Sequence, residues 1–337
     1  MADFDYPQRL SLARLPTPVQ RLDRLSADLG VDLLVKRDDL TGMELSGNKI
    51  RKLEFVLAEA LARDSTAVIT TGGWQSNHCR ATAIAAVGLG MRPYLLLHTP
   101  DGEPPAEPDG NHLLDRLVGA EIRYITADQY TDIEAHLARW AAELVGAGER
   151  PFVIPSGAST ALGAMGYVAM VDELGAQHRA GEVPGGRLPD FIVHACGSGG
   201  TTAGLVLGTH AFGLATRVIS YAVCDDVAYF LDKVDGIIDR AAERFPGLPG
   251  ADDVTYDVVD EWKGVGYALS TAEELAFLRD TARGDGLFLD PVYSGKAFRG
   301  LVEELRRGKR YHPGSTVLFV HTGGLFGLFP KRNELVF

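Results

Sequence analysis

The sequence predicts an α/β protein with two open, twisted parallel-sheet domains that carry helices on both faces. Short apolar, β-branched runs alternate with segments of helical period from one end of the chain to the other. Because these runs are apolar throughout, they are typical of parallel strands that helices cover on both sides. The 337 residues also exceed the usual size of one hydrophobic core, which favours two domains.

The first half of the chain contains five of the expected strands. They lie at 32–38, 66–71, 92–98, 121–126 and 151–156, where large apolar and β-branched residues gather. Helical period appears at 48–62 and again at 133–145. A stretch rich in Gly and Pro, 101–110, is predicted to be a surface loop.

The second half repeats this alternation. Strands are expected at 191–196, 218–224 and 316–322, and helices at 272–283 and 296–308. Two more loops rich in Gly and Pro lie at 181–189 and 246–253. The pattern alone puts the domain boundary somewhere between residues 150 and 190.

Composition excludes several classes of function. A formal net charge of −12 argues against binding to nucleic acid or to an anionic membrane, since both require clustered Lys and Arg. Three widely spaced cysteines and nine histidines without ligand spacing predict neither a disulfide framework nor a metal site. The acidic start resembles no targeting peptide, and no apolar run approaches the ~20 residues of a membrane span. We therefore expect a cytoplasmic protein.

The strongest local motif is FIVHACGSGGTTAGLVLG at 191–208, a strand that runs through a glycine-rich loop into a helix. Glycines let the backbone approach a ligand, and the free N–H groups of a helix start favour a phosphate. The loop lacks the Lys-Ser/Thr ending of a P-loop, and Thr202 stands where a dinucleotide fingerprint has its third glycine. The motif therefore predicts a cup for one phosphate monoester, although a plain strand-to-helix turn explains the same pattern.

A second unit of this kind is AVITTGGWQSNHCRATAIAAVGLG at 67–90. Its helix start carries Gln75, Ser76, Asn77 and His78, which suit a carboxylate ligand, and Ser76 or Asn77 can cap the helix. The alternative is a capped helix with no ligand. The amphipathic helix that starts near Lys49, in SGNKIRKLE, raises the same question, because its lysine is either a solvated charge or a binding group.

Three further segments place aromatic or hydroxyl side chains at turns. They are DPVYSGKA with Tyr293, KGVGYALSTAEE with Tyr267 before a capping box, and HTGG with Thr322. Each has a structural interpretation when taken alone. Together, the loops follow strand ends, where ligands of open α/β sheets collect.

These motifs, in this order, make the chain similar to the pyridoxal-phosphate (PLP) family that holds D-cysteine desulfhydrase and 1-aminocyclopropane-1-carboxylate (ACC) deaminase. The resemblance runs nearly end to end through SGNKIRKLE, QSNHCRATA, ACGSGGTTAGL, DPVYSGKA and HTGG. It implies the tryptophan-synthase-β-like fold, PLP fold type II, and a homodimer. It also implies a large domain of residues 1–48 and 165–337 and a small domain of residues 49–164.

The resemblance assigns roles to individual residues. Lys49 matches the lysine that binds the cofactor covalently, whereas Lys52, one helical turn on, is expected to remain a solvated charge. Asn77 matches the contact to the cofactor's 3′-oxygen, and Tyr267 and Tyr293 match two active-site tyrosines. The expected cofactor-binding residues are Lys49, Asn77, Cys196, Gly197, Ser198, Gly199, Gly200, Thr201, Thr202, Ser294, Thr322 and Gly323. The expected substrate-binding residues are Trp74, Gln75, Ser76, Asn77 and His78, and the expected catalytic residues are Lys49, Ser76, Tyr267 and Tyr293.

Two positions bear on the reaction. In the family, ACC deaminases carry a glutamate and a leucine where this chain has Ser294 and Thr322, and desulfhydrase-type members carry small hydroxyl residues. A carboxylate facing the pyridine nitrogen favours its protonation and strengthens the electron sink, whereas a hydroxyl leaves the sink weaker. Expelling a thiolate from Cβ needs less assistance than opening a strained ring, so we expect D-cysteine to yield pyruvate, hydrogen sulfide and ammonia.

Other functions remain open at this point. They are ACC deaminase, a lyase for another β-substituted amino acid such as L-cysteate, a dinucleotide-dependent oxidoreductase, and a PLP-binding protein without turnover. The base that removes the α-proton is either Lys49 or a tyrosinate.

Overall fold

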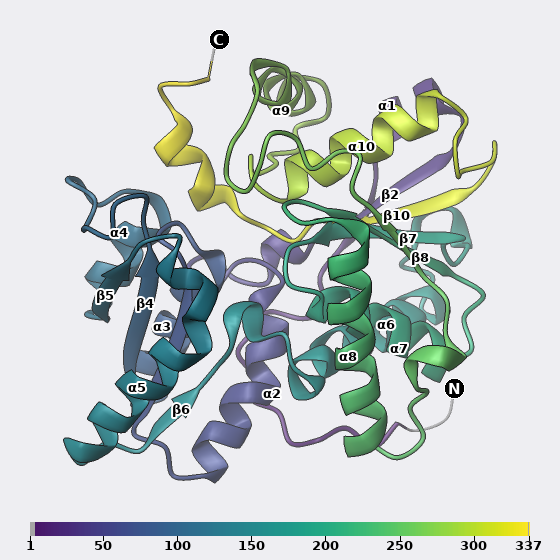
Figure 1. The fold of residues 1–337 in the computed structure, drawn as a ribbon. Coiled ribbons are helices and arrows are strands. Elements are labelled where there is room, and N and C mark those ends of the chain that lie inside the picture. The colour runs from purple at the N-terminus through teal and green to yellow at the C-terminus, as the bar shows by residue number, and fades with distance from the viewer. Residues whose placement is uncertain (1–3, 336) are drawn as a thin grey trace.

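The computed structural model describes residues 4–335 and 337, and it contains two sheets (Figure 1). The larger sheet has six strands in the order β1-β2-β10-β7-β8-β9, and the smaller has four in the order β5-β4-β3-β6. All neighbouring strands pair in parallel except β1, which runs antiparallel to β2. The predicted α/β class with two parallel sheets is confirmed.

All eight predicted strands are present, and two short ones were missed. The larger sheet contains β1 (Val19–Arg21), β2 (Asp32–Lys36), β7 (Phe191–Cys196), β8 (Arg217–Ala222), β9 (Asp257–Val259) and β10 (Thr316–Val320). The smaller sheet contains β3 (Ala67–Gly73), β4 (Arg92–His98), β5 (Glu121–Ile125) and β6 (Pro151–Val153). The missed strands, β1 and β9, are the two edges of the larger sheet and have only three residues each.

Helices cover both sheets, and the four predicted helical segments are confirmed to within a few residues. The helices are α1 (Asp23–Leu29), α2 (Lys49–Ala62), α3 (Asn77–Gly88), α4 (Gly110–Leu117), α5 (Ile133–Gly146), α6 (Ala161–Arg179), α7 (Gly200–Ala211), α8 (Val227–Arg244), α9 (Ala272–Asp285) and α10 (Ser294–Arg306). Six 3₁₀ turns join them: η1 (Asp38–Leu40), η2 (Gln129–Asp132), η3 (Ser156–Ala158), η4 (Pro184–Gly186), η5 (Ala251–Asp253) and η6 (Leu325–Lys331). The capping box predicted before α9 is present, between Thr271 and Glu274.

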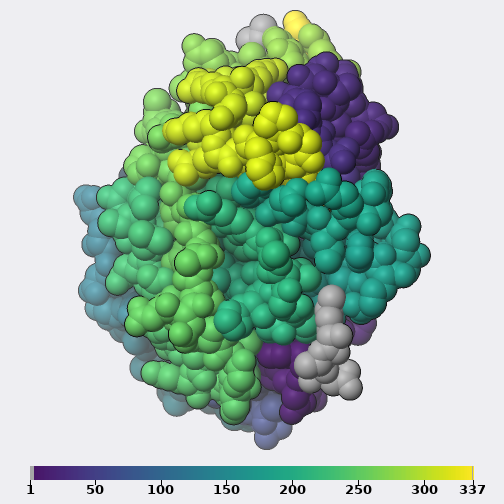
Figure 2. Space-filling view, turned by 90° about the vertical axis from the view of Figure 1, so that its right-hand side faces the viewer, coloured from purple at the N-terminus to yellow at the C-terminus, as the bar shows by residue number. Residues whose placement is uncertain are grey.

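The two ends of the described chain meet in the larger sheet. β2 and β10 pair in parallel, with Leu33 opposite Val317. Figure 2 shows the corresponding early (purple) and late (yellow) segments in contact on one face. The smaller sheet is formed by strands between residues 67 and 153, inside the segment predicted as the small domain. The border predicted at 164/165 falls within α6, and the domain division itself stays a prediction.

Helix α2 lies between the two sheets and is buried on nearly all sides (Figure 1). It crosses α6 closely, because a Cβ on Gly166 would lie 2.5 Å from the backbone of Arg51. Hydrophobic residues of α2, α6 and α7 share the largest buried cluster. The position of α2 is therefore set by packing against both halves of the molecule.

A buried charge cluster also holds α2. The guanidinium of Arg51 donates to Asp38 at 2.8 Å and to Glu173 at 3.0 Å, and Lys36 donates to Glu173 at 2.5 Å. The phenol of Tyr167 donates to Asp38 at 2.7 Å. Burial alone would raise the pKa of Asp38, but the nearby Arg51 guanidinium holds it below its usual range. The cluster therefore links α2 to β2, η1 and α6.

The last turn of the chain reaches across to the smaller sheet's helices. η6 follows β10 and lies beside α4 (Figure 1). Arg332 forms an ion pair with Asp109, the residue before α4. Among the residues that the structure describes, no helix is long and apolar enough to cross a membrane.

Candidate active site

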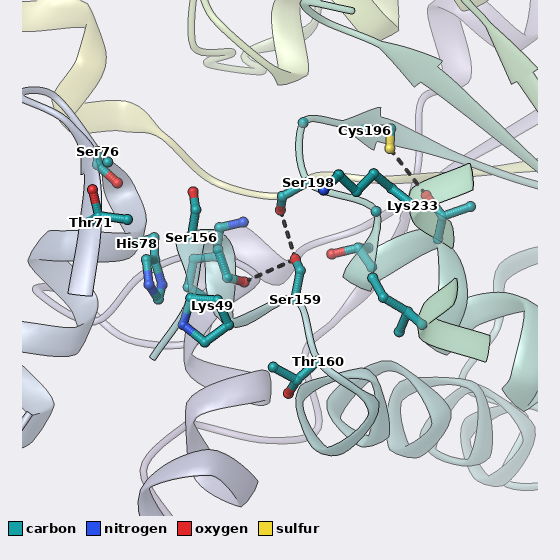
Figure 3. Close-up of a pocket in the computed structure, with 18 of the residues that line it drawn as sticks. Lys49, Thr71, Ser76, His78, Ser156, Ser159, Thr160, Cys196, Ser198 and Lys233 are labelled. Atoms are coloured by element: carbon teal, nitrogen blue, oxygen red, sulfur yellow. Dashed lines mark hydrogen bonds between the residues drawn. The ribbon is translucent and has the colours of Figure 1, made fainter. Parts of the chain in front are cut away.

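A cavity of about 1100 Å³ lies where the carboxyl ends of the strands of both sheets face each other (Figure 3). Its walls include residues at the ends of β3, β4, β7 and β10 and the start of α2. Ligands of open α/β sheets bind at this edge. The five motifs found in the sequence all contribute to this one cavity.

Helix α2 starts at Lys49, directly after a loop that is fixed against the turn following β10. Gly47 has a φ of 105°, and a Cβ there would lie 2.8 Å from the carbonyl oxygen of Thr322. The backbone N–H of Asn48 donates to the same carbonyl at 3.1 Å. Glycine is required at position 47 because both the left-handed backbone and this close contact exclude a side chain.

The amine of Lys49 lies in the cavity and has no hydrogen-bond partner among the described residues. Desolvation by the surrounding protein lowers its pKa to about 8. An ordinary lysine has a pKa near ~10.4 and is almost fully protonated at neutral pH. A far larger fraction of Lys49 is neutral, and a neutral amine is a nucleophile.

The prediction that Lys52 is solvated was wrong. Its side chain is fully buried, and its ammonium donates to the carbonyl of Gly157 at 3.2 Å and to the hydroxyl of Ser159 at 3.4 Å. Burial, and then the nearby charge of Lys49, lower its pKa well below the ordinary value. Because positions i and i+3 share one helix face, Lys49 and Lys52 face the same side, and that side is covered here.

The glycine-rich loop predicted as a phosphate cup curves around Lys52. A Cβ on Gly200 would lie 2.9 Å from the Lys52 Nζ and 2.7 Å from the Ser159 Oγ. The Gly200 N–H donates to the Ser159 hydroxyl at 3.3 Å, and the hydroxyls of Ser159 and Ser198 are 2.8 Å apart (Figure 3). The start of α7, two hydroxyls and the buried amine of Lys52 therefore converge on one point, which suits a dianion, and a dianion bound there would favour the charged form of Lys52.

Ser159 and Lys52 were not found as site residues in the sequence. Ser159 follows β6 in a segment without a distinctive motif, so no sequence signal marks it. Lys52 carried a usable signal, namely its spacing of three residues from Lys49 on one helix.

At the start of α3, Ser76 is the N-cap, and its hydroxyl accepts from the backbone N–H of Cys79 at 3.2 Å. Ser76 and Asn77 both line the cavity, so the helix start faces it. His78 also reaches the wall, but its Nε2 lies 2.8 Å from the hydroxyl of Thr70, and burial lowers its pKa well below the ordinary value. His78 is therefore a neutral ring held by its neighbours.

Two residues predicted to bind substrate point elsewhere. The amide of Gln75 donates to the carbonyl of Asp109 at 2.8 Å and accepts from the N–H of Asn111 at 2.9 Å, so it ties the loop to α4. Trp74 packs edge-on against His112, with ring centroids 6.2 Å apart. Neither is among the described residues that line the cavity, so their contact with a substrate stays a prediction.

Tyr267 and Tyr293 meet at the cavity, with their hydroxyl oxygens 2.5 Å apart. Burial raises the pKa of both phenols, and for Tyr293 the adjacent Tyr267 adds to the effect. Both are therefore protonated at neutral pH and act as hydrogen-bond donors rather than as bases.

The two hydroxyl residues that were predicted to set the reaction lie differently. Thr322 lines the cavity. The hydroxyl of Ser294 is fully buried, donates to Asp290 at 2.6 Å and accepts from the Asp290 N–H at 2.8 Å. Ser294 is not among the described residues of the wall, so its contact to a cofactor nitrogen stays a prediction.

The cavity therefore collects most of the predicted site residues. Those that line it are Lys49, Ser76, Asn77, His78, Cys196, Gly197, Ser198, Gly199, Thr201, Thr202, Tyr267, Tyr293, Thr322 and Gly323. Those that the described wall does not include are Trp74, Gln75, Gly200 and Ser294. Within the described part of the chain, no three His, Cys, Asp or Glu side chains are close enough to hold a metal ion.

Comparison with known proteins gives a consistent result. The family model described as "Pyridoxal-phosphate dependent enzyme" matches residues 10–323. A protein of Arabidopsis thaliana, named as a mitochondrial bifunctional D-cysteine desulfhydrase/1-aminocyclopropane-1-carboxylate deaminase, is 43% identical over 329 residues, which are 96% of this chain and 80% of that protein.

Solved structures extend this similarity to the fold. The crystal structure of an ACC deaminase homologue has a TM-score of 0.88 and 37% identity, and the match covers 98% of this chain and 95% of that one. The fungal L-serine ammonia-lyase of Rhizomucor miehei has a TM-score of 0.63 at 17% identity, over 94% of this chain and 95% of that one. The second match supports the fold alone.

Proposed function

The chain belongs to the pyridoxal-phosphate-dependent enzyme family, and on that premise we propose that it is a β-eliminating lyase that converts D-cysteine into pyruvate, hydrogen sulfide and ammonia. The main support is the amine of Lys49, which has no hydrogen-bond partner among the described residues and lies in the cavity one helical turn from the buried Lys52 at the glycine-rich loop. The 43% identity to a protein named for this activity supports the choice of substrate.

The residues of the cavity fit pyridoxal 5′-phosphate. Among the described residues, Lys52 has hydroxyl and carbonyl partners at the cup but no carboxylate, so the phosphate would supply the charge that balances it. Gly200 has no room for a Cβ, which keeps the N–H groups at the start of α7 accessible. The amine of Lys49 is within the same cavity and would hold the aldehyde carbon.

When bound, pyridoxal phosphate supplies an electron sink that makes the α-proton of an amino acid removable. The protein contributes the other functions. The start of α3 at Ser76 and Asn77 would bind the substrate carboxylate, and the protonated Tyr267–Tyr293 pair would donate hydrogen bonds to the substrate. Lys49 is the base that we propose for the α-proton, because its amine has a pKa of about 8 whereas both phenols hold their protons.

ACC deaminase is the second candidate, since the Arabidopsis relative carries both activities in its name. The hydroxyl of Thr322 on the cavity wall, in place of a leucine, favours the desulfhydrase. A lyase for another β-substituted amino acid, such as L-cysteate, would use the same residues.

The test is a substrate screen with the purified holoenzyme. D-Cysteine is expected to release sulfide and pyruvate faster than L-cysteine, L-cysteate or ACC, and Lys49→Ala should abolish release. Release of 2-oxobutyrate from ACC without pyruvate from D-cysteine would replace the proposed reaction by the second candidate.

We propose in addition that the protein is a cytoplasmic homodimer. The three cysteines are free, which agrees with a reducing compartment. Light scattering on the eluting holoenzyme measures the oligomer, and cell fractionation measures the location.

A further inference from the structure

Asn111 occupies the first turn of α4 and is fully buried, outside the wall of the cavity. Its side-chain amide makes three hydrogen bonds to the β3–α3 segment. Its Nδ2 donates to the carbonyl of Gln75 at 2.9 Å and to the Oδ1 of Asn77 at 3.0 Å. Its Oδ1 accepts from the Nε of Arg80 at 3.0 Å.

These partners permit only one orientation of the Asn111 amide. A guanidinium N–H can only donate, so the oxygen of Asn111 must face Arg80. A backbone carbonyl can only accept, so the NH₂ of Asn111 must face Gln75. The orientation is set by a guanidinium that can only donate and a carbonyl that can only accept, and it leaves one N–H of Asn111 directed at Asn77.

The orientation of the Asn111 amide in turn fixes the orientation of the Asn77 amide. Because Asn111 presents a donor, Asn77 must turn its Oδ1 towards it, and the NH₂ of Asn77 is left for the cavity that this residue lines. A flipped Asn77 would place two NH₂ groups against each other in a buried site.

We propose that Asn111 is a positioning residue that fixes Asn77 as a hydrogen-bond donor to the 3′-oxygen of pyridoxal phosphate. The inference rests on the proposed function and on the contact of the Asn77 side chain with the cofactor's 3′-oxygen, which the family resemblance implies. Arg80 extends the arrangement, since it is fully buried and also donates to the carbonyls of Glu44 and Ser46 in the loop before Lys49. One buried network therefore orients Asn77 and supports the loop that leads to the reactive lysine.

Asn111→Asp tests this polarity with little change of shape. The new carboxylate still accepts from Arg80, but it offers no donor to Asn77 or to the carbonyl of Gln75. The amide of Asn77 would then turn its NH₂ towards this carboxylate and its carbonyl towards the cofactor oxygen. Loss of a donor to a charged oxygen is expected to speed the release of pyridoxal phosphate about tenfold.

The experiment is a double-mutant cycle on the holoenzyme with Asn77→Ala, Asn111→Asp and the two combined. Two quantities are measured for each protein: the rate of pyridoxal phosphate release, and the pH midpoint of the visible absorption band, which reports charge on the cofactor. Each single substitution should speed release and raise the midpoint, since a donor stabilises the ionised oxygen. The double variant should behave like Asn77→Ala alone.

Asn333→Asp, at an exposed asparagine, controls for the added charge and should change neither quantity. Additive effects in the double variant, or an unchanged midpoint in Asn111→Asp, would show that Asn111 acts only through the general packing of α4, and the inference would fail. If Asn77→Ala alone changes nothing, the contact of Asn77 fails together with the inference. Pyruvate release from D-cysteine by the wild-type enzyme remains a separate test of the proposed function.

Discussion

At the scale of single residues, the chemistry of the site depends on two lysines three positions apart. Both are surrounded by protein, and burial lowers the pKa of each. They differ in their partners, because Lys52 donates to a carbonyl and a hydroxyl while Lys49 has no partner among the described residues. One is thereby suited to hold an anion and the other to react.

The lowered pKa of Lys49 predicts how the protein without cofactor recombines with pyridoxal phosphate. Only the neutral amine reacts, so the rate should rise with pH and level off above a midpoint near 8, the pKa of Lys49, instead of near ~10.4. Stopped-flow absorbance between pH 6 and pH 10 measures this rate. A midpoint above 10 would contradict the lowered pKa.

Lys52→Met should have opposite effects on stability and on cofactor binding. Without phosphate, a buried ammonium with no carboxylate partner destabilises the fold, so the cofactor-free variant should melt at a higher temperature than the wild type. Binding of pyridoxal phosphate should weaken by about ten- to a hundredfold, since a charge-assisted hydrogen bond is lost.

Pyridoxal, which lacks the phosphate, provides the control for Lys52. Its affinity should be nearly equal for the wild type and for Lys52→Met. Equal losses for both ligands would show that Lys52 supports the structure of the cup and does not hold the phosphate.

Most of the site residues that the sequence predicts line the cavity, whereas Lys52 and Ser159 were missed. Lys49, Asn77 and the glycine loop stand in recognisable patterns, and all contribute to the cavity. A lysine on an amphipathic helix looks the same whether its face is covered or solvated, so the spacing of Lys52 from Lys49 did not by itself show that Lys52 is buried. Gln75 opens the motif QSNHCRATA and Trp74 precedes it, but the turn after β3 directs both side chains to α4.

At the scale of elements, glycine turns decide where helices start relative to the cavity. Gly47→Ala should lower both thermal stability and cofactor affinity, because the backbone has a φ of 105° and the new Cβ would lie 2.8 Å from the Thr322 carbonyl. The expected loss of unfolding free energy is about 1–3 kcal/mol. Differential scanning calorimetry measures the loss.

Gly90→Ala is the matched control for Gly47. Gly90 also has a positive φ, of 78°, but a Cβ there would meet no atom within 4 Å. The Gly90→Ala variant should lose about 1 kcal/mol of unfolding free energy, the cost of a side chain on a left-handed backbone, and should keep its cofactor affinity. Equal behaviour of the two variants would show that the contact with Thr322 is unimportant.

The two strands that the sequence failed to predict share a physical cause. β1 and β9 have three residues each and lie at the sheet edges, where most of their side chains are only partly buried or exposed. A continuous apolar run marks a strand only if helices cover both faces of that strand. An edge strand can be short and can contain polar residues, so it has no such run. The central strands, which are covered, were all predicted.

At the scale of the whole molecule, a charge cluster as well as packing holds α2 against β2 of the larger sheet and against α6. Asp38→Asn should destabilise the protein by about 3–5 kcal/mol, because it leaves Arg51 buried without one of its two carboxylates. Urea unfolding at neutral pH measures this change. A loss below about 1 kcal/mol would mean that water or movement of Glu173 compensates.

The same cluster predicts a dependence of stability on pH. Arg51 and Lys36 hold the pKa values of Asp38 and Glu173 below their ordinary range, although burial alone would raise both. The unfolded chain therefore binds protons more readily than the folded one. The stability that these carboxylates contribute is fully present above the ordinary carboxyl pKa of about 4 and is lost as the pH falls through their lowered pKa values in the folded protein. Glu173→Gln should therefore flatten the acid side of the stability curve, measured by melting temperature from pH 3 to pH 7.

The overall architecture could be predicted because parallel sheets have a strong sequence signature. The arrangement of the two sheets relative to each other could not be predicted. That arrangement depends on α2 and α6, whose crossing at Gly166 is a contact between residues more than a hundred positions apart. No periodicity in the sequence encodes such a contact. It is also the contact that brings the Lys49 segment and the glycine loop to one cavity.

The position of η6 has a practical consequence for handling the protein. This final turn rests on α4 through Arg332 and Asp109, and α4 carries Asn111, whose amide donates to Asn77 on the cavity wall. An affinity tag or a fluorescent protein fused to the carboxyl end would therefore be expected to disturb the contact between η6 and α4, and through Asn111 the position of Asn77. A purification tag is better placed at the amino end, and a pair of differently tagged preparations with unequal coenzyme content would reveal the mechanical link directly.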